Sequence, residues 1–127
     1  MIDRLPVTVG FELEFELDNA LERLNRHLVA AGVTTSFSGR WRHTPTEVSS
    51  SGAWDVKTDS SCGYELVSPV IKTMSELKNA ADVATLVQRF GGRATSRCGF
   101  HVHLGLKSLP VSAYARLFAF MTRYESA

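Results

Sequence analysis

Hydrophobic and polar residues alternate with a period of two near the start of the chain. Over residues 7–17 the apolar side chains share one face, and the other face carries Glu12, Glu14 and Glu16. This alternation is typical of a β-strand that buries one face. Three further segments alternate in the same way, and a fourth, shorter one is a possible strand. The three are residues 54–58, 64–68 and 98–106, and the shorter one is residues 33–37.

Apolar residues spaced three and four apart predict three helices. The first carries a leucine stripe; we expect the Asp18 carboxylate to cap its N-terminus and Gly32 to end it. The second covers residues 76–90 and stops at a pair of glycines. The third covers residues 110–124, with a proline near its first turn.

The order of these elements predicts an α+β fold, with a mixed or antiparallel sheet and helices packed on one face. Residues 38–52 are rich in Ser, Thr and Gly and predict a loop or weak hairpin. A chain of 127 residues with 44% hydrophobic and 21% charged residues fits a single domain over residues 1–127.

Composition excludes several classes of function. Fourteen Lys and Arg against 13 Asp and Glu leave a net charge of +1, which gives no electrostatic reason to bind nucleic acid or a membrane surface. No segment has the apolar length of a membrane span or a signal peptide. Cys62 and Cys98 are expected to be free thiols, with a disulfide as the alternative. We therefore expect a cytoplasmic protein.

Three segments carry candidate chemistry. Residues two apart on a strand, such as Glu12 and Glu14, project from the same face with their Cα atoms about 6.5–7 Å apart, a spacing that suits one divalent cation per carboxylate. A solvated edge strand is the alternative.

His101 and His103 likewise share a strand face and could both reach a metal ion or a phosphate, or they are incidental surface histidines. Asp59 and Glu65 flank a predicted turn, where a turn aspartate and an exposed strand glutamate are the alternative. Together the three segments could present one metal-binding surface.

Four segments, in this order and spacing, resemble the amidoligases. This family belongs to the carboxylate-amine ligase superfamily, which includes glutamine synthetase and glutamate-cysteine ligase. The resemblance implies a glutamine-synthetase-like catalytic fold that joins a carboxylate to an amine with ATP, through an acyl-phosphate, at a site with Mg²⁺ or Mn²⁺. The segments are GFELEFE (10–16), WDVKTDSS (54–61), GYELVSP (63–69) and CGFHVHLG (98–105).

The resemblance also implies roles for individual residues. Lys57 is expected to contact a substrate carboxylate or phosphate, with a surface ion pair as the alternative. One of the two histidines is expected to bind a metal ion or to face the phosphates, and the alternation places both on the site face. The catalytic residues are thus Glu12, Glu14, Glu65, His101 and His103; the ATP-binding residues are Lys57 and His103; and the metal ligands are Glu12, Glu14, Asp59, Glu65 and His101.

Catalytic domains of the amidoligases are longer than this chain. The resemblance therefore implies the N-terminal part of such a domain, with an exposed sheet edge and an apolar helix face, completed by a further segment, by self-association or by a complementing chain. The expected substrates are a small-molecule or peptide carboxylate and an amine. Two alternatives stay open: a non-catalytic metal- or nucleotide-binding module, and a Zn²⁺-dependent hydrolase that uses the paired histidines.

Overall fold

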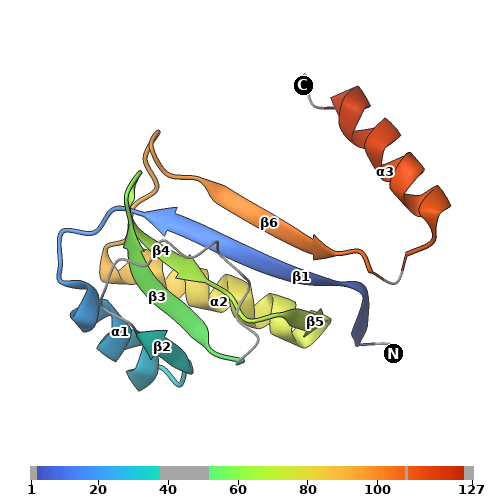
Figure 1. Cartoon of the computed structure of the whole chain (residues 1–127). Coiled ribbons are helices and arrows are strands. Elements are labelled where there is room, and N and C mark those ends of the chain that lie inside the picture. The colour runs from blue at the N-terminus through green and yellow to red at the C-terminus, as the bar shows by residue number, and fades with distance from the viewer. Residues whose placement is uncertain (1–2, 38–51, 108, 125–127) are drawn as a thin grey trace.

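The computed structural model describes residues 3–37, 52–107 and 109–124, which form an α+β fold (Figure 1). This part of the chain contains a six-stranded mixed sheet and three helices. The strands are β1 (Arg4–Phe15), β2 (Thr35–Phe37), β3 (Trp54–Asp59), β4 (Gly63–Val67), β5 (Ile71–Thr73) and β6 (Phe100–Gly105), and the helices are α1 (Leu21–Ala30), α2 (Met74–Phe90) and α3 (Val111–Tyr124).

The long strand β1 organises the sheet. Its neighbours β4 and β5 follow one another along one edge, and β6 pairs with its other edge. These pairings are antiparallel, as is the pairing of β3 with β4, whereas β2 pairs with β3 in parallel. Segments far apart in the sequence, β4 and β6, are thereby brought to the two sides of one strand.

The hydrophobic core lies between one face of the sheet and the helices α1 and α2, as Figure 1 shows. Alternation places the apolar side chains of β1 on this face, where α2 contacts the strand, and the leucine stripe of α1 packs over β2 and β3 and against α2. Leu24, Leu28, Val56 and Leu66 are fully buried. The prediction that β1 buries one face is therefore confirmed, and two of the three predicted helices, α1 and α2, lie on that side of the sheet.

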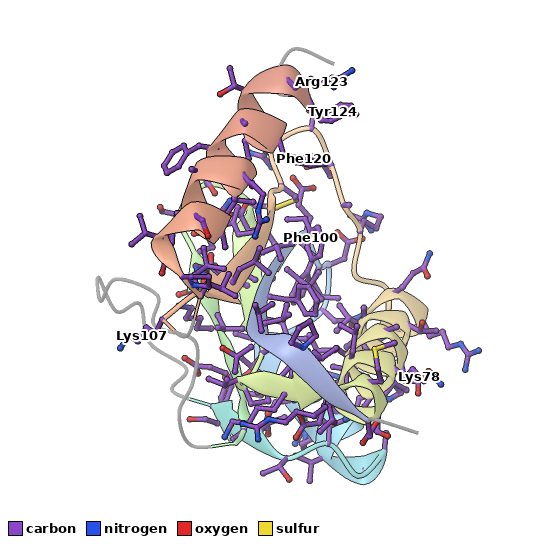
Figure 2. All side chains as sticks on the ribbon, turned by 90° about the vertical axis from the view of Figure 1, so that its right-hand side faces the viewer. Lys78, Phe100, Lys107, Phe120, Arg123 and Tyr124 are labelled. Atoms are coloured by element: carbon purple, nitrogen blue, oxygen red, sulfur yellow. A yellow bond between two sulfur atoms is a disulfide. The ribbon has the colours of Figure 1, made fainter. Side chains whose placement is uncertain are left out.

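Helix α3 differs from this arrangement, because it stands apart from α1 and α2 (Figures 1 and 2). None of its residues is buried, and Phe118 and Phe120 are 69% and 61% exposed. The apolar face of β6 is also open, with Phe100 60% exposed. The expectation that all helices pack on one face is wrong for α3, since most of its large apolar side chains stay exposed within the described part of the chain. No helix in the described ranges is long and apolar enough to cross a membrane.

Two local features differ from what the sequence predicts. The Asp18 carboxylate does not cap α1; it forms an ion pair with Arg93 at 2.7 Å, and Ala20 occupies the N-cap position without a side-chain cap. The short strand β5 was not predicted, because three residues carry too little alternation to recognise. The predicted loop or hairpin over 38–52 lies outside the described residues except for Gly52.

The prediction of free thiols is also wrong, because Cys62 and Cys98 form a disulfide. Cys62 lies in the turn between β3 and β4, and Cys98 lies just before β6. Since β4 and β6 pair with opposite edges of β1, the two cysteines meet at one end of the sheet, with their Cα atoms 5.1 Å apart.

The start of α2 provides a test of local stability. The Thr73 side chain accepts from the backbone N–H of Glu76, and the Glu76 side chain accepts in return from that of Thr73, which forms a capping box. We expect Thr73→Ala to lower the free energy of unfolding by about 1 kcal/mol, measured by urea denaturation. Thr85→Ala is the control, because the Thr85 hydroxyl only donates to a carbonyl of its own helix. Equal losses in the two variants would contradict the capping role.

Candidate metal-binding site

The sheet face opposite α1 and α2 carries the acidic residues. On one side of β1 the strand register aligns Glu14 with Glu65, and Glu65 with Lys57. Residues opposite one another in antiparallel strands project from the same face. Three segments separated in the sequence thus contribute one row of charged side chains across β1, β4 and β3.

On the other side of β1, two histidines of β6 bind the same carboxylate. His101 Nδ1 lies 2.7 Å from Glu12 Oε2, and His103 Nε2 lies 2.7 Å from Glu12 Oε1. Glu12 is 5% exposed, whereas the two imidazoles are partly open to solvent. A carboxylate buried this deeply needs charged or hydrogen-bonding partners, and the two imidazoles supply them.

Glu12, Glu65 and His101 form the group whose geometry best suits a metal ion. One carboxylate oxygen from each glutamate and one imidazole nitrogen all lie within 4.8 Å of one another. Glu14 Oε1 lies 3.9 Å from His101 Nε2, so Glu14 borders this group. The carboxylate oxygens suit Mg²⁺ or Mn²⁺, and an imidazole nitrogen is also a ligand for Zn²⁺.

Lys57 faces the site as one half of a buried ion pair. Its Nζ lies 3.0 Å from Glu65 Oε2, with both side chains largely shielded from solvent. Burial raises the pKa of Glu65; Lys57 opposes this effect, whereas the charges of Glu12 and Asp59 add to it. The surface ion pair considered as an alternative for Lys57 is therefore a buried one.

Asp59 lies at the end of the site, held by the turn between β3 and β4. Its Oδ1 accepts from the backbone N–H of Ser61 at 2.8 Å and of Cys62 at 3.0 Å, and also from the Ser61 hydroxyl. Burial raises the pKa of Asp59, but these hydrogen bonds outweigh it and leave the pKa below its usual value. The Ser61 hydroxyl also lies 3.5 Å from Glu14 Oε2, which connects Asp59 with the charged row.

Gly99 is a site residue that the sequence analysis missed. Its backbone N–H donates to Glu14 Oε2 at 2.7 Å, and its carbonyl accepts from the backbone of Glu14. A Cβ atom at this position would lie 2.9 Å from His101 Nε2 and 3.3 Å from Glu14 Oε1. The glycine directly before the two-histidine strand was the available signal, because a missing side chain allows this close approach.

The third carboxylate of the alternating strand, Glu16, lies outside the group. It forms an ion pair with Arg97 and accepts from the Thr95 hydroxyl at 3.2 Å. The hydrogen bond from Arg97 lowers the pKa of Glu16. The negative charge of Glu16 is therefore balanced by the Arg97 guanidinium, which makes Glu16 a matched control for Glu14.

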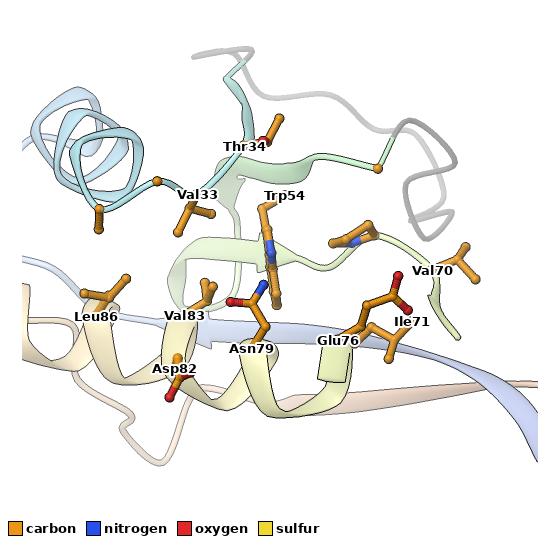
Figure 3. A pocket seen from close by; sticks show the side chains of 14 residues that line it. Val33, Thr34, Trp54, Val70, Ile71, Glu76, Asn79, Asp82, Val83 and Leu86 are labelled. Atoms are coloured by element: carbon orange, nitrogen blue, oxygen red, sulfur yellow. The ribbon is translucent and has the colours of Figure 1, made fainter. Parts of the chain in front are cut away.

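A cavity of about 450 Å³ lies on the helix side of the sheet and is distinct from the acidic face. Figure 3 shows Trp54, Asn79 and Val83 among the side chains that line it. Trp54 is 5% exposed and belongs to the core. This cavity lies across the sheet from the predicted site residues.

The pair formed by Glu12 and His101 links stability to pH. Burial raises the pKa of Glu12, but the hydrogen bonds with His101 and His103 outweigh it, so that pKa lies below the usual 4.5. The hydrogen bond with Glu12 raises the pKa of His101 above the usual 6.5, against a smaller effect of burial. The stabilisation from His101 is complete below pH 6.5 and is lost as pH rises through its folded pKa. The stabilisation from Glu12 is present above pH 4.5 and is lost as pH falls through its folded pKa.

This coupling is measurable in metal-free protein. We expect Glu12→Gln to lower the pKa of His101 towards its usual value, because the neutral amide no longer favours the imidazolium. The measurement is an NMR titration of the histidine ring protons in the presence of a chelator. Glu16→Gln should leave the pKa of His101 unchanged. An equal pKa in wild type and Glu12→Gln would contradict the pairing.

Comparison with known proteins agrees with the motif pattern. A family model described as "Putative amidoligase enzyme" matches residues 5–126, which is nearly the whole chain. Searches of curated proteins and of solved structures gave no match. The matched range includes all the residues of the acidic face described above. The chain therefore belongs to this amidoligase family.

Proposed function

We propose that this chain provides the divalent-cation site of an ATP-dependent ligase that joins a carboxylate to an amine. Membership of the amidoligase family supports the ligase class. The observation that carries the proposal is the close group of Glu12, Glu65 and His101 ligand atoms, within 4.8 Å of one another. The expected likeness of the sheet to that of glutamine synthetase is part of the same proposal.

The charge balance of the site favours a cation. Among the described residues, the carboxylates of Glu12, Glu14, Asp59 and Glu65 share this face with the Lys57 ammonium and the imidazoles of His101 and His103. Buried carboxylates repel one another unless cations compensate them. Mg²⁺ or Mn²⁺ held by these carboxylates and His101 would neutralise the excess. When bound, such ions supply charge stabilisation to phosphate oxygens.

The proposed reaction has two steps. An oxygen of the substrate carboxylate attacks the γ-phosphorus of ATP; the bond to the bridging oxygen breaks, and ADP leaves. The amine nitrogen of the second substrate then attacks the acyl-phosphate carbon, loses a proton and displaces inorganic phosphate. In this scheme Lys57 and His103 contact the ATP phosphates or the substrate carboxylate, and the substrates are a small-molecule or peptide acid and an amine. In such reactions the transition state is stabilised mainly by positive charge held next to the oxygens of the transferred phosphoryl group.

Binding and turnover are separate parts of this proposal. The exposed apolar side chains of β6 and α3 favour completion of the catalytic domain by more protein surface. We propose that a further segment or a complementing chain provides that surface. The cation and nucleotide site is therefore the part that this chain can be tested for directly.

Thermal unfolding tests the site. We expect Mn²⁺ or Mg²⁺ together with a non-hydrolysable ATP analogue to raise the Tm, because ligands that bind only the folded state stabilise it. At about one hundred times Kd the gain is about 2.7 kcal/mol, or roughly 10 °C for a domain of this size. Glu14→Ala should abolish most of the shift, and Glu16→Ala should retain it.

The alternatives give different results in the same assay. A shift with Zn²⁺ alone, insensitive to nucleotide, would favour the metal-dependent hydrolase that uses His101 and His103. A Tm shift with nucleotide and metal, but no ligase activity in the completed domain, would favour a non-catalytic binding module. The absence of any shift, or equal shifts in Glu14→Ala and Glu16→Ala, would contradict the proposed site.

A further inference from the structure

The Cys62–Cys98 disulfide lies at one end of the candidate metal site. It joins the turn between β3 and β4 to the residue that precedes Gly99 and β6. The two cysteines are 36 positions apart in the sequence. The bond therefore joins two segments that border the site, the β3–β4 turn and the loop before β6. Neither cysteine has a role in the proposed reaction.

On one side, the bond fixes the turn that holds Asp59. The Cys62 side chain is 4% exposed, and its backbone N–H donates to Asp59 Oδ1 at 3.0 Å. The preceding residue, Ser61, donates to the same oxygen and also lies 3.5 Å from Glu14 Oε2. Displacement of Cys62 would therefore move the donors that orient Asp59.

On the other side, the bond fixes the backbone that holds Glu14. The residue after Cys98 is Gly99, whose N–H donates to Glu14 Oε2 at 2.7 Å. Gly99 also lies so close to His101 that an added Cβ would be 2.9 Å from Nε2. Displacement of Cys98 would therefore alter the position of Glu14 relative to His101.

We propose that the Cys62–Cys98 disulfide is a reversible redox latch whose reduction weakens divalent-cation binding at this site while leaving the domain folded. This inference rests on the proposed function, because it concerns the same cation site. The sheet should survive reduction, since β6 keeps its ladder to β1 and the core lies on the other face. Cysteine pairs that form in reducing compartments are commonly redox-sensing, which fits a latch of this kind.

The reduction step is an ordinary thiol–disulfide exchange with a dithiol. A thiolate of the dithiol attacks Sγ of Cys98, which is a half-buried residue whereas Cys62 is buried, and the Cys62 thiolate leaves. The second thiol of the reductant then attacks the mixed disulfide and releases Cys98. Two electrons and two protons pass to the protein as two thiols, and the dithiol becomes a cyclic disulfide.

Mn²⁺ binding to the oxidised and reduced chain tests the latch. The protein is reduced with dithiothreitol, freed of reductant by gel filtration without oxygen, and titrated with Mn²⁺ while EPR reports the free ion. Mass spectrometry after alkylation gives the redox state, and circular dichroism gives the fold. We expect the Kd to rise about tenfold on reduction, as when residues that orient metal ligands are removed, and to recover on reoxidation.

Two variants distinguish an effect on the positions of the metal ligands from a general loosening of the fold. Cys62→Ala with Cys98→Ala should bind Mn²⁺ like the reduced chain and should not respond to dithiothreitol. Glu16→Ala should show the same tenfold rise in Kd on reduction as the wild-type chain, because Glu16 is paired with Arg97 and lies outside the candidate metal site.

Three results would overturn the inference. Equal Kd values in chains shown to be oxidised and reduced would remove the latch and leave the proposed function standing. Unfolding on reduction would give the disulfide a purely structural role. Absence of Mn²⁺ binding in the oxidised chain would contradict the proposed function itself, and the latch with it.

Discussion

The Glu12 carboxylate is the constraint on which the rest of the site depends. It is almost completely buried in the middle of the longest strand, where an uncompensated charge would be strongly destabilising. Each of its oxygens is hydrogen-bonded to an imidazole of β6. These two side-chain hydrogen bonds, together with the backbone ladder, fix the register of β6 on β1. The same register brings His101 close to Glu65 across the strand.

Period-two alternation produces both the core and the site. One face of β1 contributes apolar residues to the core that α1 and α2 cover, and the other gathers carboxylates next to β4 and β6. A rigid sheet braced by a packed core is a suitable support for ligands whose positions must be held within fractions of an ångström. The disulfide braces the open end of that face, where Asp59 and Glu14 are held by turn and loop backbone.

Much of this arrangement could be predicted from the sequence, because alternation and helical spacing report which side chains share a face. The acidic face of β1, the paired histidines and the burial of Trp54 follow from that logic. Contacts set by tertiary register could not be predicted: Asp18 pairs with Arg93 instead of capping α1, and Cys62 meets Cys98 only because β4 and β6 flank β1. Gly99 and Ser61 were missed for the same reason, since both act through backbone or hydroxyl contacts with distant carboxylates.

The most direct test of the account is to locate the cation. Crystals of the oxidised chain grown with Mn²⁺ would be measured at the manganese absorption edge, and the anomalous map would be calculated. The account predicts a peak among the side chains of Glu12, Glu65 and His101, and its loss in Glu12→Gln. A peak elsewhere, or an empty map with the Glu12 carboxylate still bonded to both imidazoles at saturating Mn²⁺, would contradict the assignment of this face as a metal site.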